Sequence, residues 1–338
     1  MRRLASSLSI AAALCVGSMP GHADERWDAV VAAARKEGEA VLYTSNAGSR
    51  CLDQNLATFR SAYGINVQVM SARGSEIQER IRVEQSSGRF VGDVNWTGDP
   101  AIYLQAQNGA LERLGKIPNA ANVAAPLVAS EYSVPVFLSR ISLLVNARLV
   151  NPEQDLKSWR DLLSPKWSGK ILTDRLDVPG AGNAFFQVTN TAFGQDFHER
   201  LARQKLEFTR EIGTSQRRVA QGEYAVFIPA VTQYMMQVKG LPVRYWVPQE
   251  GAPYYTTSLS VLKNAPHPNA ARVLINHLLA TASQVNCARD GAGPTVTGVV
   301  EQLEPELQDM HGQKLIGAPD PNPDAAAAGL ALAKQIYK

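Results

Sequence analysis

Small, hydroxylic and glycine-rich residues follow the predicted strands of this sequence, where they can hold an oxyanion. In the first third of the chain these residues are Ser45, Asn46, Arg73, Gly74 and Ser75. Backbone N–H groups and hydroxyls in such loops can donate to an anion, and an arginine can add two parallel hydrogen bonds. The alternative is that the serines are ordinary helix caps. Both interpretations stay open for any single residue, and the recurrence of the pattern in several loops favours a binding cleft.

Two more loops extend this pattern. Asp99 follows the third predicted strand, and Gly182 and Asn183 lie in a glycine-rich loop that follows a strand at 171–173. Asn183, like the serines, could instead cap a helix. The carboxylate of Asp99 fits badly with a purely anionic ligand and could instead hold an amine. It therefore favours a zwitterion such as an aminophosphonate or an amino acid.

Aromatic residues at or just beyond strand ends are the second candidate group. Tyr234 and Tyr254 could line a pocket with their ring faces, as could Trp96 and Tyr255, or each could pack in the core. One of the adjacent pair Tyr254 and Tyr255 should face inward. Arg140, in the segment between two apolar runs, is either a ligand for a carboxylate or the partner of a nearby aspartate.

Catalytic and metal-binding motifs do not emerge from the sequence. It contains no Gly-x-Ser-x-Gly elbow, no Walker loop and no His-Glu-x-x-His pair. The four histidines after residue 23 lack the spacing of metal ligands; they are His198, His267, His277 and His311. We therefore predict a binding protein rather than an enzyme, with no resident metal and no cofactor.

Regular alternation of helices and strands would position these residues in the first third of the chain. The apolar spacing predicts helices over 27–37, about 50–62 and 75–86, and strands over 40–44, 65–69 and 91–96. This order is typical of a parallel α/β sheet, in which the loops after the strands meet at one edge.

The rest of the chain is less regular. Two apolar runs, 132–136 and 141–145, flank the residues 137–140, and a short helix begins at 159–162. Further strands are predicted over 171–173, 225–228 and 258–262, and further helices over 181–191, 230–238, 268–279 and 325–337.

The first 23 residues have the pattern of a secretory leader. Arg2 and Arg3 precede an apolar run at 4–16, and Gly21-His22-Ala23 forms a cleavage site, so we predict export to the periplasm with cleavage near Ala23. The formal net charge of +3 falls to about +1 without the leader. A nearly neutral chain argues against a nucleic-acid partner held by bulk charge.

Two cysteines, Cys51 and Cys287, remain after the leader takes Cys15. An oxidising compartment permits a disulfide between them, which would close a loop of about 235 residues and stabilise the fold by about 4–5 kcal/mol in the chain-entropy model. The alternative is two buried free thiols.

Several segments resemble an extracellular solute-binding protein of an ABC importer. They are Val41-Leu42-Tyr43-Thr44-Ser45, Gly74-Ser75-Glu76-Ile77, Trp159-Arg160-Asp161-Leu162-Leu163 and Pro165-Lys166-Trp167-Ser168-Gly169-Lys170. The resemblance implies a two-lobed α/β fold of type II, with mixed sheets, β-strand hinges and a ligand cleft between the lobes. It implies a monomer that binds a small anionic or zwitterionic organic solute and delivers it to an inner-membrane ABC permease.

The resemblance also implies a division of the chain. Residues 1–23 would be the signal peptide, 24–135 with about 257–300 the first lobe, about 136–256 the second lobe, and 301–338 a C-terminal helical tail.

The branch that this chain resembles includes ferric-iron-binding proteins, whose site has one His, one Glu and two adjacent tyrosines. Those positions fall here on Ala47, Gly98, Tyr234 and Met235. Three of the four ligands are therefore missing, and Fe³⁺ prefers hard anionic oxygen donors. A ferric receptor is the alternative function.

Overall fold

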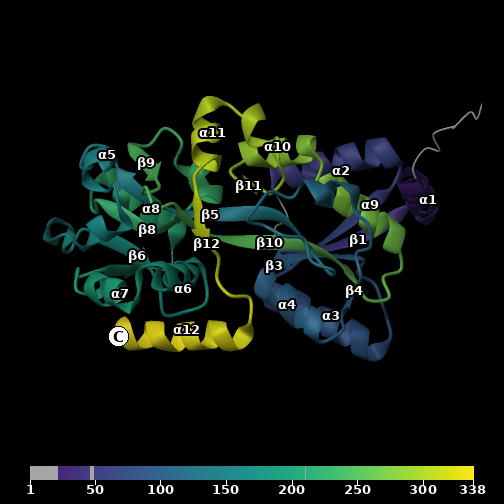
Figure 1. The fold of residues 1–338 in the computed structure, drawn as a ribbon, viewed down its shortest axis with the longest axis horizontal. Coiled ribbons are helices and arrows are strands. Elements are labelled where there is room, and N and C mark those ends of the chain that lie inside the picture. Colours follow the sequence, from purple (N-terminus) through teal and green to yellow (C-terminus); the bar gives the residue numbers. More distant parts are fainter. Residues whose placement is uncertain (1–21, 46–48, 210) are drawn as a thin grey trace, which may run out of the picture.

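Two lobes, joined by two long antiparallel strands, make up the molecule (Figure 1). The structure is a computed structural model and describes residues 22–45, 49–209 and 211–338. Strands are hydrogen-bonded in the order β2-β1-β3-β10-β5-β8-β6-β7, which runs from one lobe to the other. The predicted two-lobed α/β architecture is confirmed.

The first lobe contains the parallel strands β1, β2 and β3, with helices on both faces. Its elements are α1 (His22–Glu37), β1 (Glu39–Thr44), α2 (Arg50–Tyr63), β2 (Asn66–Ser71), α3 (Gly74–Ser87), β3 (Val94–Gly98), α4 (Asp99–Gln107), β4 (Leu111–Glu112), η1 (Pro118–Asn122), α9 (Pro268–Leu278), α10 (Thr281–Arg289), β11 (Gly293–Pro294) and η5 (Val300–Gln302).

The second lobe repeats this plan around parallel β6, β7 and β8. Its elements are α5 (Pro152–Asp155), η2 (Trp159–Leu163), η3 (Pro165–Trp167), β6 (Ile171–Asp174), α6 (Ala181–Phe193), α7 (Gln195–Ala202), β7 (Glu207–Thr209), α8 (Ile212–Gln221), β8 (Val226–Val231), η4 (Thr232–Val238) and β9 (Val243–Trp246).

The strands β5 (Val134–Asn146) and β10 (Ala252–Leu262) connect the lobes. Val134 and Val136 of β5 lie in the core of the first lobe, whereas Ile141 and Leu143 lie in the core of the second. The predicted lobe boundaries, 135/136 and 256/257, fall within these two strands.

One continuous strand, β5, replaces the two separate apolar runs that the sequence predicts. The polar pair Ser139 and Arg140 looks like a break in the sequence, but both residues are buried and pair with β10. Likewise, β8 continues to Val231 through the start of the predicted helix 230–238, and only a 3-10 helix follows it.

The tail contacts both lobes. Leu303 and Leu307, at η5 and in α11 (Pro305–His311), pack on the core of the first lobe. The short strand β12 (Leu315–Gly317) pairs with β10. The final helix α12 (Pro323–Ile336) lies along α6, where Ala333 and Tyr337 join the core of the second lobe (Figure 1).

A disulfide joins Cys51 of α2 to Cys287 of α10, with a Cα–Cα distance of 4.9 Å. Of the two possibilities that the sequence leaves open, the structure therefore has the bridge, and both cysteines belong to the first lobe. None of the helices in the described ranges is long and apolar enough to cross a membrane. The predicted leader, apart from its last two residues, lies outside those ranges.

Candidate functional site

The carboxyl ends of three parallel strands meet at one edge of the first lobe. Thr44, the last residue of β1, pairs with Ser71 of β2 and with Trp96 of β3. The loops that follow these strands therefore leave the sheet side by side. Ser45 is exposed there, and Asn46 lies outside the described residues.

Arg73, Gly74 and Ser75 form the start of α3 at this edge. Arg73 is the residue before the helix, and its backbone N–H donates to the Glu76 carboxylate at 3.1 Å. Its exposed guanidinium forms no ion pair with any residue that the structure describes. Gly74 and Ser75 occupy the first turn, whose N–H groups lack partners within the helix.

The helix-cap interpretation of the predicted site residues is wrong for all three. Ser49, not Ser45, caps α2, and it accepts a hydrogen bond from the Leu52 backbone at 3.3 Å. Ser75 and Asn183 lie inside their helices rather than before them. The hydroxyls of Ser45 and Ser75 therefore do not cap these helices.

Asp99 begins α4 and joins it to the hinge strand β10. Its carboxylate accepts hydrogen bonds from the hydroxyls of Thr256 and Ser258, the latter at 2.6 Å. Burial raises the pKa of Tyr254, and the nearby Asp99 charge raises it further. The structure thus brings Asp99 and Tyr254 together, with the phenol protonated at neutral pH.

Gly182 and Asn183, predicted as ligand contacts, are engaged in local structure instead. The Gly182 N–H donates to Asp174 at 3.1 Å, and a Cβ at this position would lie 2.2 Å from the Arg175 carbonyl oxygen. The Asn183 amide donates to the Leu176 carbonyl at 2.8 Å and accepts from Gln187. These contacts fix the start of α6.

Tyr255, which the sequence offers as a possible pocket aromatic, lies near Asp174, a residue that the predicted site does not include. Burial raises the pKa of Tyr255 to about 12; a hydrogen bond with Ser139 opposes this shift, and the nearby Tyr234 and Asp174 add to it. Tyr255 therefore lies close to Tyr234, whereas its neighbour Tyr254 lies close to Asp99. Strand alternation explains the split, because successive side chains point to opposite faces.

Arg140 and Trp96 have structural roles that the sequence did not resolve. The interpretation of Arg140 as the partner of a nearby aspartate is wrong: its guanidinium donates to the His311 carbonyl, and no carboxylate among the described residues pairs with it. Trp96 packs against Phe137 in the core, and its indole N–H donates to Thr257 at 2.9 Å.

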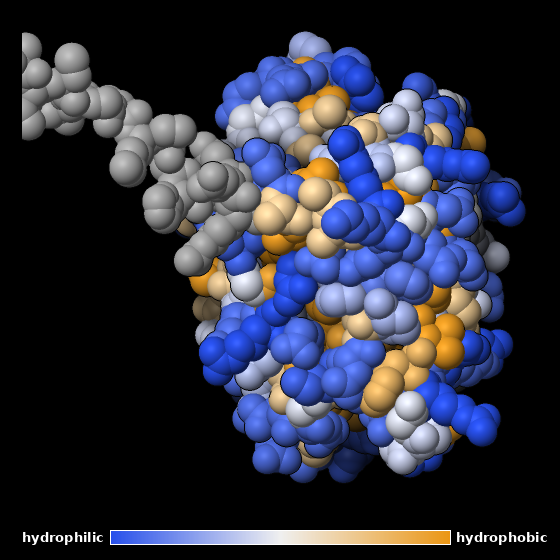
Figure 2. All heavy atoms as spheres, turned by 90° about the vertical axis from the view of Figure 1, so that its right-hand side faces the viewer, coloured by the Kyte–Doolittle hydropathy of each residue, from blue (hydrophilic) through white to orange (hydrophobic). Residues whose placement is uncertain are grey.

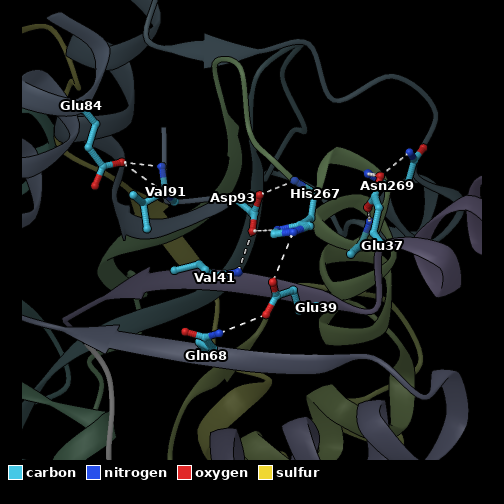
Figure 3. Close-up of polar contacts among 11 residues, drawn as sticks. Glu37, Glu39, Val41, Gln68, Glu84, Val91, Asp93, His267 and Asn269 are labelled. Carbon is cyan, nitrogen blue, oxygen red and sulfur yellow. Dashed lines mark hydrogen bonds and ion pairs between the residues drawn. The ribbon is translucent and has the colours of Figure 1, made fainter. Parts of the chain in front are cut away.

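A buried polar cluster occupies the opposite edge of the same sheet (Figure 3). Asp93, just before β3, accepts from His267 and from the Val41 backbone, and His267 also faces Glu39 at 3.6 Å. Within the described part of the chain, no group of three His, Cys, Asp or Glu residues could hold a metal. We therefore assign this cluster to the fold.

Comparison with known proteins identifies a family. A model described as "Bacterial extracellular solute-binding protein" matches residues 54–312. An uncharacterized protein of Haemophilus influenzae is 26% identical over 168 residues, which are 47% of this chain and 48% of the relative. The chain thus spans about half the length of this curated relative.

Solved structures share the fold at low sequence identity. Iron-bound HitA from Pseudomonas aeruginosa is 20% identical, with 89% of this chain and 99% of that chain covered and a TM-score of 0.70. A Bordetella ferric binding protein is 18% identical, with 88% of this chain and 98% of that chain covered and a TM-score of 0.73. The spermidine/putrescine ABC transporter substrate-binding protein PotD from Streptococcus pneumoniae is 16% identical, with 89% of this chain and 99% of that chain covered and a TM-score of 0.70.

Proposed function

This chain belongs to the bacterial extracellular solute-binding proteins, and we propose that it is the monomeric periplasmic receptor of an ABC importer. It binds a small anionic or zwitterionic organic solute between its lobes and delivers it to an inner-membrane permease. The family match over residues 54–312 and the two-lobed fold support this role.

The Arg73 guanidinium, which forms no ion pair with any described residue, is the observation that carries the choice of solute. It stands beside the first-turn N–H groups of Gly74 and Ser75, and together these donors suit a phosphonate, phosphate ester or carboxylate. Ser45 leaves the neighbouring strand end, where its hydroxyl can add another donor.

Asp99 supports a zwitterion rather than a simple anion. β1 lies between β2 and β3, so two strand spacings, or about 10 Å, separate the ends of β2 and β3 along the sheet edge. Arg73 and Asp99, which follow these strands, would therefore bind solute groups that are about 10 Å apart. An amine near Asp99 and Tyr254 would complement an acidic group near Arg73. Asp99 keeps acceptor capacity for an amine, because a carboxylate has about four lone-pair sites and two hydroxyls donate to it.

The second lobe closes over the solute through Tyr234, Tyr255 and Asp174. Closure is favoured to the extent that the solute binds the closed arrangement better than the open one. The strands β5 and β10 are the connections about which the lobes move. The receptor carries out no turnover, and hydrolysis of a bound solute would contradict this function.

A thermal-shift screen with phosphonates, phosphate esters, carboxylates and amino acids tests the proposal. A solute present at about 100 times its dissociation constant should stabilise the protein by about 2.7 kcal/mol. Arg73→Ala should weaken binding of the hit at least tenfold. Arg89→Ala, which removes a charge outside the first turn of α3, is the matched control and should leave binding unchanged.

A ferric receptor is the second candidate, favoured by the iron-bound HitA and ferric binding protein structures. Tyr234 and Tyr255 offer phenolate oxygens near the carboxylate of Asp174. Addition of Fe³⁺ would then produce a visible tyrosinate–iron absorption band that Tyr234→Phe abolishes. We expect the protein to stay colourless, because three of the four ligand positions of the iron site hold other residues.

A further inference from the structure

The C-terminal tail crosses from the first lobe to the second beside the hinge strands (Figure 1). Its helix α11 packs on the first lobe, where Leu303 lies in the core and Leu307 packs against it. Residues 312–314 then lead to β12, whose Leu315 pairs with Ala252 of β10. The helix α12 follows on the second lobe. The tail is therefore a connection between the lobes in addition to β5 and β10.

His311, the last residue of α11, holds the first-lobe end of this crossing. Its Nε2 atom lies 3.0 Å from the Ala288 carbonyl oxygen of α10, and it carries the ring proton, because a carbonyl oxygen only accepts. The His311 carbonyl, which has no partner within its helix, accepts a hydrogen bond from the buried Arg140 guanidinium of β5. The end of α11 is thus tied to a helix of the first lobe and to a hinge strand.

The strand β12 begins the second-lobe end of the crossing. The backbone N–H of Ala252 donates to the Lys314 carbonyl at 2.7 Å. The neighbouring Gly251 carbonyl accepts from the indole of Trp159 at 2.8 Å, and Trp159 lies in the core of the second lobe. This end of β10 is therefore fixed to the second lobe, and β12 is fixed with it.

The helix α12 strengthens the second-lobe anchor. Ala333 and Tyr337 lie in the core of that lobe, and the Tyr337 hydroxyl is 2.7 Å from Nδ1 of the fully buried His198. A Cβ at Gly329 would lie 2.9 Å from the Gln187 side chain, so α12 packs closely on α6. Because of these contacts, the tail cannot slip along the second lobe without loss of core packing.

The crossing between the two anchors is short. Four Cα–Cα steps separate His311 from Leu315, which limits their distance to about 13–14 Å. A groove of about 1300 Å³ lies between α11 and the second lobe, and Met310 of α11 and Met235 of η4 are among the residues that line it. This space leaves room for α11 to move relative to the second lobe. The length of the crossing, rather than tight packing, then limits that movement.

We propose that the tail is a strap that limits how far the two lobes open. Two neighbouring strands of a sheet can bend and twist together, as a hinge motion requires. A short additional connection with an anchor in each lobe opposes this motion, because wide opening would have to stretch residues 312–314 or pull β12 away from β10. The strap therefore reduces the population of widely open arrangements even when no solute is bound.

Insertion of Gly-Ser-Gly-Ser between Gly312 and Gln313 tests the proposal, because it adds up to about 13–14 Å of slack and leaves both anchors in place. Spin labels on Gln78→Cys of α3 and Asp196→Cys of α7, two exposed positions, measure the distance between the lobes by electron–electron double resonance without solute. We expect the insertion to lengthen the mean distance by more than about 2 Å and to broaden its distribution. The same insertion after Val128, which is 78% exposed in a loop of the first lobe, is the matched control and should leave the distribution unchanged.

The labels attach selectively in the mature chain, because its two native cysteines form the disulfide. Ala333→Glu, which places a charge in the core of the second lobe, should release α12 and shift the distance in the same direction as the insertion. Thermal unfolding of each variant checks that the lobes remain folded. A folded insertion variant with the wild-type distance distribution would overturn the proposal, as would an equal shift in the Val128 control. If the insertion prevents folding, the distance distribution of Ala333→Glu decides in the same way.

Discussion

Replacement of Asp93 by alanine should strongly destabilise the first lobe. The Asp93 side chain is fully buried and accepts three hydrogen bonds: from the Val41 backbone at 2.7 Å, from the His267 backbone at 2.7 Å and from His267 Nδ1 at 3.0 Å (Figure 3). These bonds join β1, the start of β3 and the segment that leads into α9.

The expected loss follows from what the substitution leaves behind. Hydrogen bonds to a charged group contribute about 1.5–3 kcal/mol each, and removal of one partner from a buried pair typically costs about 3–5 kcal/mol. We expect Asp93→Ala to lower the free energy of unfolding by about 3–5 kcal/mol. For a lobe of this size, the melting temperature should fall by about 6–20 °C.

Thermal unfolding followed by circular dichroism measures this effect, with Glu39→Gln as the control. Glu39 faces the same His267 but is exposed and lies 3.6 Å away, so its loss should cost less than about 0.5 kcal/mol. If Asp93→Ala unfolds within 2 °C of the wild type, the cluster does not hold these elements together and the reasoning is wrong.

Three other perturbations have expected outcomes. Replacement of both Cys51 and Cys287 by serine should lower the denaturation midpoint by an amount that corresponds to about 4–5 kcal/mol, with little change in the urea slope. Gly182→Ala should destabilise the protein by about 1–3 kcal/mol in the same assay, because its Cβ would overlap a carbonyl, whereas Gly74→Ala meets nothing within 4 Å and should be neutral. Burial lowers the pKa of His198 to about 3. The contribution of the neutral ring to stability is therefore complete above pH 6.5 and declines on acidification toward pH 3. Melting temperatures measured from pH 7 to pH 4 should fall less steeply in His198→Gln than in the wild type.

Local sequence patterns predicted the fold well where the hydrophobic period was clear. The alternation of helices and strands in the first lobe was visible because each element buries one regular face. The hinge strand β5 was not, because it is buried on both sides and carries Ser139 and Arg140 in its middle. A polar residue buried between lobes has no local signature, since its partners come from segments more than 90 residues away.

The candidate site was predicted only in part for a similar reason. Strand order placed Ser45, Arg73 and Asp99 at one sheet edge, as the general rule for parallel sheets requires. Residue types alone could not distinguish side chains that are available to bind a solute from those that form hydrogen bonds with nearby residues of the chain. Asn183 has the right chemistry, but its amide is already bonded at both ends.

Apolar residues on the outer face of the first lobe form small groups among hydrophilic ones (Figure 2). In the described part of the chain, the groove beside α11 is lined by apolar side chains such as Met235 and Met310 and by charged ones such as Glu306 and Lys314. No sequence pattern indicated this groove, because residues from β5, η4 and α11 build it only after folding.

The most direct test of the solute-receptor function is calorimetric titration of the wild type and of Arg73→Ala with the strongest stabiliser from the solute screen. We predict that the wild type binds an acidic or zwitterionic solute at one site per chain and that Arg73→Ala binds it at least tenfold more weakly. Equal affinities of the two proteins would show that the solute does not bind at this edge of the sheet.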